Sequence, residues 1–289
     1  MRPLPILAVQ AAPVPWEVDA TWEKFEVTTR RLVQAFPSTK LVVYPELFLS
    51  AIGPTTIPPR AGYSVERVAQ RIPGPLTERL GELAEELQIW LVPGSVYEIG
   101  DAGRIYNTAV AVRPDGSIAA RYRKIFPWRP WERSFPGEDL VLFDIDDVGR
   151  VGLMICYDGW FPEVARNLAW LGAELILQPA ATWTSDREQE LVLVRAQAIT
   201  NQVIVVNVNV GGGYGEGRSL VVDPEGHVLQ AAGGGEEVIT DVLDFDGVRR
   251  VRQYGSVGMN RLWEEVRERQ RIRLPMYGGS LPGMIQPSA

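Results

Sequence analysis

The chain has 289 residues, of which 46% are hydrophobic and 22% charged, and its formal net charge is −7. This composition is ordinary for a soluble globular protein with one large domain or two small ones, and the acidic balance argues against nucleic acid as a main partner because phosphate binding needs a basic face. The single cysteine excludes an intrachain disulfide and fits a reducing compartment, so we expect a cytoplasmic protein.

No membrane attachment is expected. Residues 1–10 read as a first strand and lack the long apolar stretch of a signal peptide. The most apolar later run, Val203–Val210, is too short and too interrupted to span a bilayer.

Apolar runs typical of buried strands alternate along the chain with helical stretches. The predicted strands are Leu4–Gln10, Leu41–Tyr44, Ile89–Val96, Thr108–Arg113, Ile118–Arg123, Val141–Ile145, Val151–Cys156, Leu175–Gln178, Val203–Val210, Ser219–Val222 and Val238–Val242. The predicted helices are Asp19–Ala35, Pro75–Leu87, Pro162–Leu171 and Asp186–Asn201.

Both β–α–β and hairpin connections are expected, which indicates an α/β fold of sheets covered by helices. Hairpin turns are predicted at 113–116 (Arg-Pro-Asp-Gly) and 223–226 (Asp-Pro-Glu-Gly). In the last helix an apolar stripe is predicted through Leu191, Val194, Arg195 and Ala198. No low-complexity linker divides the chain, so we expect one domain over 1–270 and an irregular tail, rich in proline and glycine, over 271–289.

Cys156 lies where an apolar strand passes into a short turn and then into a helix that begins with Pro162. This context raises a side chain onto the edge of a sheet and aims the next backbone N–H, that of Tyr157, at whatever the thiol attacks. The alternative is a buried and inert thiol, which is common for a free cysteine.

His227 is the only histidine, and its place in a turn that enters a strand indicates a surface residue. Serine–histidine and cysteine–histidine catalysis would both depend on this one residue. A zinc site of His and Cys ligands is excluded because the chain has only one of each. We therefore expect no metal, and a catalytic Cys156 would need a carboxylate or a lysine as its base. The glycine-rich segment 211–217 matches no phosphate-binding motif and indicates a flexible loop.

Glu46 and Lys124 supply the missing types of side chain. Glu46 follows the strand Leu41–Tyr44 among apolar neighbours, where desolvation raises a carboxyl pKa and makes it a usable base and acid. Lys124 follows the strand Ile118–Arg123, where it could stabilise a thiolate and then an oxyanion. The alternatives are a surface glutamate and an ordinary lysine at a strand edge.

Three motifs in this order resemble the Glu–Lys–Cys triad of the nitrilase superfamily of carbon–nitrogen hydrolases. They are Tyr44-Pro-Glu46, Tyr122-Arg-Lys-Ile125 and Ile155-Cys-Tyr-Asp158, and the segments 162–169 and 217–226 resemble the same family. The resemblance implies a four-layer α-β-β-α sandwich that forms a homodimer or a higher homo-oligomer. It also implies that 1–270 is the carbon–nitrogen hydrolase domain and that no cofactor is needed.

Within that superfamily, residues 122–132, Phe135-Pro-Gly137 and Cys156–Gly159 are similar to the aliphatic amidases and formamidases. By this resemblance Glu132 matches a second glutamate that positions the substrate amide. Two alternatives stay open. One is a nitrilase or N-carbamoyl-amine hydrolase with the same triad, and the other is a non-catalytic binding protein on the same fold.

The triad implies that a small carboxamide is hydrolysed through a cysteine thioester, with the Tyr157 N–H as an oxyanion donor. Four tryptophans are candidates for the pocket wall, with ordinary core packing as the alternative for each. They are Trp128, Trp131, Trp160 and Trp183.

Overall fold

Two β-sheets form the centre of the molecule, a computed structural model that describes residues 2–53, 59–268, 273–274 and 279–280. The first sheet has seven strands. Their order is β13 (Glu237–Asp244), β1 (Pro3–Gln10), β2 (Leu41–Val43), β3 (Trp90–Val92), β5 (Ile105–Val112) and β4 (Ser95–Ile99), with β6 (Ile118–Arg123) also paired to β5. The second sheet has six strands. Their order is β12 (Val228–Ala231), β11 (Leu220–Val222), β10 (Ile204–Asn209), β9 (Leu175–Ala180), β8 (Gly149–Leu153) and β7 (Leu142–Ile145).

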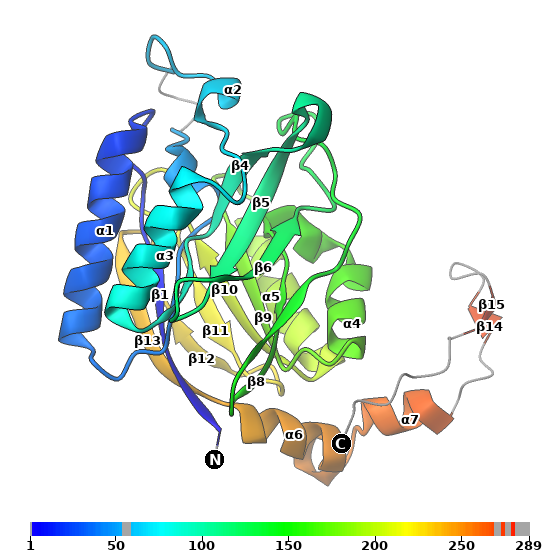
Figure 1. The fold of residues 1–289 in the computed structure, drawn as a ribbon. Helices are drawn as coiled ribbons and strands as arrows, with labels where there is room; N and C mark the ends of the chain where they lie inside the picture. Colours follow the sequence, from blue (N-terminus) through cyan, green and yellow to red (C-terminus); the bar gives the residue numbers. More distant parts are fainter. Residues whose placement is uncertain (1, 54–58, 269–272, 275–278, 281–289) are drawn as a thin grey trace.

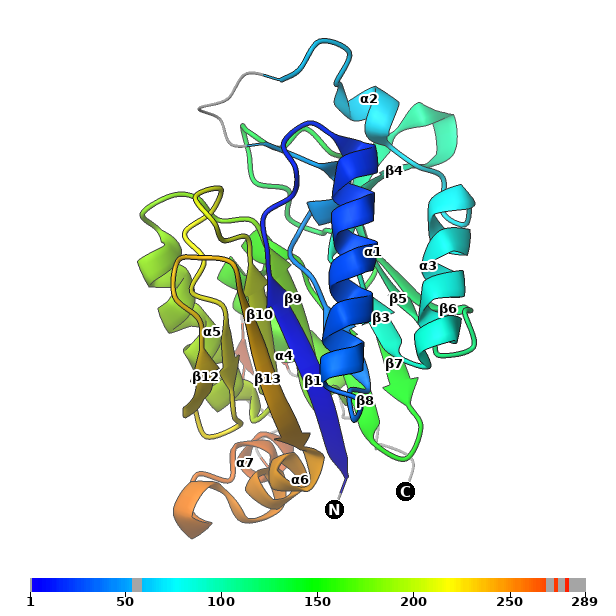
Figure 2. The same ribbon diagram turned by 90° about the vertical axis from the view of Figure 1, so that its left-hand side faces the viewer.

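Helices cover the outer face of each sheet. The helices α1 (Val18–Ala35) and α3 (Pro75–Leu87) lie on the first sheet, and α4 (Pro162–Trp170) and α5 (Arg187–Asn201) lie on the second (Figures 1 and 2). Figure 2 views the stack edge-on and shows helix, sheet, sheet and helix in succession. The predicted four-layer α-β-β-α sandwich is therefore confirmed.

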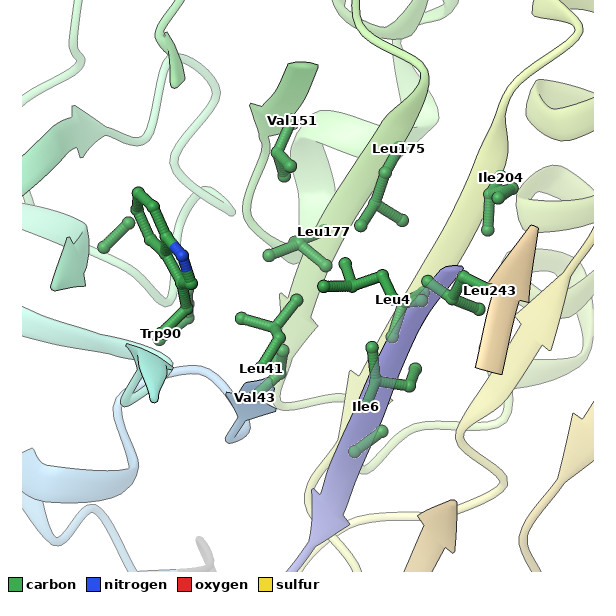
Figure 3. Close-up of a cluster of buried hydrophobic side chains, with 14 of the residues drawn as sticks. Leu4, Ile6, Leu41, Val43, Trp90, Val151, Leu175, Leu177, Ile204 and Leu243 are labelled. Atoms are coloured by element: carbon green, nitrogen blue, oxygen red, sulfur yellow. The ribbon is translucent and has the colours of Figure 1, made fainter. Parts of the chain in front are cut away.

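The alternation of side chains along each strand builds the core. In β1, Leu4 and Ile6 face the second sheet, whereas Leu7 faces the helices α1 and α3. Figure 3 shows Leu4 and Ile6 among side chains from both sheets, including Leu177 of β9. Each such aliphatic side chain contributes about 1.5–3 kcal/mol when it is fully buried, so burial of these side chains is a large part of what holds the two sheets together.

The prediction of a single strand over Ile89–Val96 is wrong, because the structure has two strands here. β3 ends at Val92 and β4 begins at Ser95. Between them Gly94 has φ +83°, and a Cβ atom there would lie 1.7 Å from the carbonyl oxygen of Pro45. The chain turns here because only glycine allows this approach, and the turn presses against the residue that precedes Glu46.

The predicted strand Val151–Cys156 is shorter than expected. β8 ends at Leu153, and Cys156 begins a short 3-10 turn, η3 (Cys156–Trp160). The predicted apolar stripe on α5 is wrong in part, because Arg195 is exposed whereas Arg187 and Glu190 are buried. The inner face of α5 is therefore largely polar.

Several short or exposed elements were not predicted. They are α2 (Val65–Val68), α6 (Phe245–Tyr254), α7 (Leu262–Glu268), the edge strand β12 and the 3-10 turns η1 (Phe48–Ser50), η2 (Asp101–Gly103) and η4 (Ser256–Gly258). The predicted tail 271–289 lies outside the described residues except for β14 (Arg273–Leu274), which pairs with β15 (Gly279–Ser280). Among the described helices, none has both the length and the apolar character of a membrane span.

Candidate active site

Three predicted residues meet in a cavity of about 220 Å³ at the ends of strands from both sheets. Glu46 follows β2, Lys124 follows β6 and Cys156 follows β8 after two further residues. All three line the cavity, and so does Glu132. Residues separated by 110 positions in the chain are thus brought together by the facing of the two sheets.

Lys124 lies between two carboxylates and is almost completely buried, with 1% of its surface exposed. Its Nζ donates to Oε1 of Glu46 at 2.7 Å and to Oε2 of Glu132 at 2.7 Å. Burial opposes the charged ammonium, but the charges of the two glutamates outweigh it and hold the pKa of Lys124 well above its usual value. Lys124 is therefore a fixed cation and not a base.

Glu46 has the properties of a general base. Its Oε1 accepts from Lys124 and also from Nδ2 of Asn107 at 2.8 Å, and its backbone N–H donates to the carbonyl oxygen of Ala180 at 3.2 Å. Burial raises the pKa of Glu46, while the charge of Lys124 acts in the opposite direction. A carboxyl held in this way can take a proton from the thiol and return it later.

Glu132 is held by four donors. Oε1 accepts from Nδ2 of Asn107 at 2.9 Å and from Oγ of Ser134 at 2.8 Å, and Oε2 accepts from Lys124 and from the N–H of Trp128 at 3.0 Å. Burial raises its pKa, but Lys124 and these hydrogen bonds lower it more, so the net shift is downward. Since a carboxylate offers about four acceptor positions, a substrate NH₂ would have to displace one of these donors.

Cys156 occupies a backbone conformation that is rare for a residue with a side chain, with φ +44°. Its carbonyl oxygen accepts from Nε2 of Gln178 at 2.9 Å, which secures the strained turn. Burial and then the charge of Glu46 raise the pKa of the thiol, while Lys124 opposes them. These effects favour the thiol over the thiolate, and a thiol needs a base to become a nucleophile.

The turn that carries Tyr157 is fixed by Asp158, which belongs to the motif Ile155-Cys-Tyr-Asp158 but had no role predicted from the sequence. The Asp158 carboxylate accepts from the Ile155 N–H at 2.9 Å, from the Phe126 N–H at 2.8 Å and from the Tyr122 hydroxyl at 2.7 Å. Burial raises its pKa to about 6. No acceptor for the Tyr157 N–H is found in the described part of the chain, so this donor is free for an oxyanion.

Three of the four predicted tryptophans line the cavity. Trp128 and Trp183 meet edge to face, with ring centroids 5.6 Å apart, and Trp131 lies at the rim with 70% of its surface exposed. Trp160 is not on the wall, and its ring lies 6.0 Å from that of Tyr157. The structure therefore brings Trp160 beside the nucleophile turn and not into the cavity.

Other cavity residues carried little signal in the sequence. Tyr97, Leu47 and Ile52 line the wall, and Tyr214 reaches it from the predicted glycine-rich loop after β10. Asn107 lies fully buried between Glu46 and Glu132. A polar residue within the apolar strand Ile105–Val112 was the only sign that could have identified it.

The side chain of His227 is exposed and lies in a turn, as predicted. Its Nδ1 lies 2.9 Å from Oδ2 of Asp223, and with the half-buried Asp223 and Glu225 it forms a group of side chains that could hold a metal ion. None of them lines the cavity, and the hydrogen bonds within the turn account for the arrangement.

Comparison with known proteins gives the family of the chain. A family model described as carbon-nitrogen hydrolase matches residues 6–253. The chain is similar to omega-amidase NIT2 of Homo sapiens, with 35% identity over 235 residues that span 76% of this chain and 82% of the relative.

Solved structures with the same fold include Nit3 of Saccharomyces cerevisiae, a member of branch 10 of the nitrilase superfamily. Its TM-score is 0.78 at 29% identity, over 90% of this chain and 97% of that one. A second is a variant of the amidase from Nesterenkonia sp. AN1 that shows Michael addition of acrylamide at the active-site cysteine. Its TM-score is 0.70 at 25% identity, over 86% of this chain and 97% of that one.

Proposed function

The chain belongs to the carbon–nitrogen hydrolase family, and from this premise we propose that it hydrolyses small uncharged carboxamides to the acid and ammonia through a thioester on Cys156. One observation carries the proposal. A buried lysine is fixed between two carboxylates, Glu46 and Glu132, at the same cavity as the only thiol of the chain. Such a group supplies a base and a cation where a carbonyl carbon would be attacked.

The first step forms the tetrahedral adduct that precedes the thioester. Glu46 takes the proton of Cys156, and the sulfur attacks the amide carbon. The carbonyl oxygen becomes an oxyanion that accepts from the Tyr157 N–H and from Lys124. An ammonium group has three donors, and Lys124 uses two of them on Glu46 and Glu132, so the third is available for the oxyanion. Removing one oxyanion donor typically costs about 10²–10³ in rate.

The second step returns the enzyme to its starting state. Glu46 gives its proton to the leaving nitrogen, the C–N bond breaks, and ammonia departs. Water then attacks the thioester while Glu46 takes a proton from it. The C–S bond breaks, the sulfur regains the proton from Glu46, and the carboxylic acid is released.

The residues that line the cavity favour a substrate with an uncharged acyl group. Its described lining is mainly apolar or aromatic, and Lys124 is its only cation, already paired with two carboxylates. A carboxylate on the substrate would be desolvated here without a partner, which costs several kcal/mol. The complex of the Nesterenkonia amidase with butyramide is an example of a neutral amide in a similar protein.

Ammonia release from butyramide tests the proposal, with Cys156→Ala as the inactive variant and Glu188→Gln as a control. Glu188 lies on α5 with 73% of its side chain exposed. We expect the wild type and Glu188→Gln to release ammonia equally, and intact-mass analysis to show a butyryl adduct on both of these proteins and none on Cys156→Ala. Full turnover by Cys156→Ala would refute the thioester route.

A substrate panel separates the alternatives with the same triad. Butyramide, butyronitrile and an N-carbamoyl amine of similar size are compared by kcat/KM. The proposal requires the amide to be the best of the three. Faster turnover of the nitrile or the N-carbamoyl amine would assign the chain to one of those activities instead.

A further inference from the structure

A second buried ion pair lies behind the nucleophile and takes no part in the mechanism above. Arg187 and Glu190 of α5 are exposed by 0% and 2%, and Nη1 of Arg187 lies 2.8 Å from Oε2 of Glu190. The same Glu190 oxygen accepts from the hydroxyl of Thr182 at 2.6 Å. The Thr182 oxygen in turn lies 3.8 Å from the sulfur of Cys156. A chain of contacts therefore links α5 to the sulfur.

The backbone of Thr182 is held in place by hydrogen bonds. Its N–H donates to Oδ1 of Asn209 at 2.7 Å, and its carbonyl oxygen accepts from Nδ2 of Asn209 at 3.1 Å and from the N–H of Glu216 at 2.9 Å. Arg187 is anchored as well, by the carbonyl oxygens of Gly217 and Arg218 at 3.1 and 2.8 Å. The geometry at the sulfur is thus set by rigid neighbours.

The direction of the hydrogen bonds follows from the number of hydrogen atoms that each group can donate. A threonine hydroxyl has one hydrogen, and a carboxylate that is paired with Arg187 can only accept. The Thr182 hydrogen is therefore committed to Glu190, and a lone pair of Thr182 faces the sulfur. That lone pair can accept an S–H but repels a thiolate.

We propose that Glu190, acting through Thr182, is a positioning residue that keeps the proton on the sulfur of Cys156 in the resting protein. The inference rests on the proposed function, in which Cys156 is the nucleophile. Other charged groups also face the sulfur, namely Glu46 after β2 and Lys124 after β6, and Asp158 lies two residues further along its own turn. Glu46 and Lys124 serve the reaction itself, whereas Thr182 and Glu190 hold the resting state and limit unproductive reaction of the thiol.

The test is the pH dependence of alkylation of Cys156 by iodoacetamide, which needs no amide turnover. The sulfur forms a bond to carbon and iodide leaves, and no other cysteine is present to react. In Glu190→Gln the side-chain NH₂ can donate to Thr182, which frees the hydroxyl to donate to the sulfur. We expect the alkylation midpoint to fall by about one pH unit, so the rate below the midpoint rises about tenfold.

Three further variants keep the test independent of misfolding. Thr182→Val, which removes the acceptor, should also lower the midpoint. Thr182→Ser, which keeps the hydroxyl, and Glu188→Gln, which makes the same change on the exposed side of α5, should match the wild type. Wild-type midpoints in both Glu190→Gln and Thr182→Val would overturn the inference, as would a rise in either. A failure to hydrolyse any amide would refute the proposed function, but the alkylation midpoints of the variants could still be compared with that of the wild type.

Discussion

Replacing Glu132 by glutamine tests the role of the second carboxylate most directly. Glutamine offers one acceptor oxygen and one NH₂ group where the carboxylate offers two oxygens. In the best rotamer the oxygen keeps Lys124 and the Trp128 N–H, and the NH₂ faces Ser134 and Asn107. The Ser134 hydroxyl can turn to accept, but Nδ2 of Asn107 loses one of its two acceptors.

The structure gives a magnitude for this change. The loss of one hydrogen bond to a charged group costs about 1.5–3 kcal/mol, and the free energy of unfolding should fall by that amount. Lys124 also loses one of its two counter-charges, so it is drawn toward Glu46 and away from the oxyanion. We expect kcat to fall by about 10²–10³, the usual cost of one oxyanion donor.

The assay combines urea unfolding with ammonia release from butyramide. Ser134→Ala is the matched control, because it removes one neutral donor from the same carboxylate and leaves its charge, and it should cost about 0.5–1.5 kcal/mol of stability with kcat within a few fold. Wild-type kcat in Glu132→Gln would refute the view that this carboxylate positions Lys124.

Three other predictions follow from the same geometry. Lys124→Met should leave two carboxylates buried without a cation, abolish ammonia release and lower the free energy of unfolding by about 3–5 kcal/mol, as measured by urea unfolding. Burial raises the pKa of Glu46, and Glu46 must be ionised to act as a base. As the pH is lowered, kcat/KM should therefore begin to fall at a pH above the pKa of an ordinary carboxyl group. A fall that begins only at the usual carboxyl pKa would contradict this prediction. Trp131→Ala should raise the KM for butyramide about tenfold, roughly 1.4 kcal/mol, whereas Trp160→Ala should leave it unchanged, since Trp131 lines the cavity and Trp160 does not.

The sequence was sufficient for the fold class and for the meeting of Glu46, Lys124 and Cys156. Each of these residues follows an apolar run, and such a run predicts a buried strand well. The ends of strands in two facing sheets lie close together, so the three side chains meet. The helix α6 was missed although Asp244 caps it and Phe245, Val248 and Val251 are buried at helical spacing, because ten residues with many charges give a weak apolar signal.

The contacts around the nucleophile could not be predicted. Thr182 approaches Cys156 across the ends of β8 and β9, and Glu190 lies on the inner face of α5, where the pattern favoured apolar residues. Such polar contacts depend on the exact register of two elements and not on local periodicity. The break at Gly94 was signalled by Pro93-Gly94, a common turn pair, and the hydrophobic run around it concealed the turn.

The charge balance of the cavity also bears on what leaves it. Glu46 and Glu132 carry two negative charges against the single positive charge of Lys124. A neutral amide enters this field without penalty, but the product is a carboxylate that meets an excess of like charge. In the proposed mechanism, the same three residues that prepare the attack therefore also favour expulsion of the acid, and butyrate should bind more weakly than butyramide. Under this proposal, electrostatic repulsion of the product directs turnover toward hydrolysis.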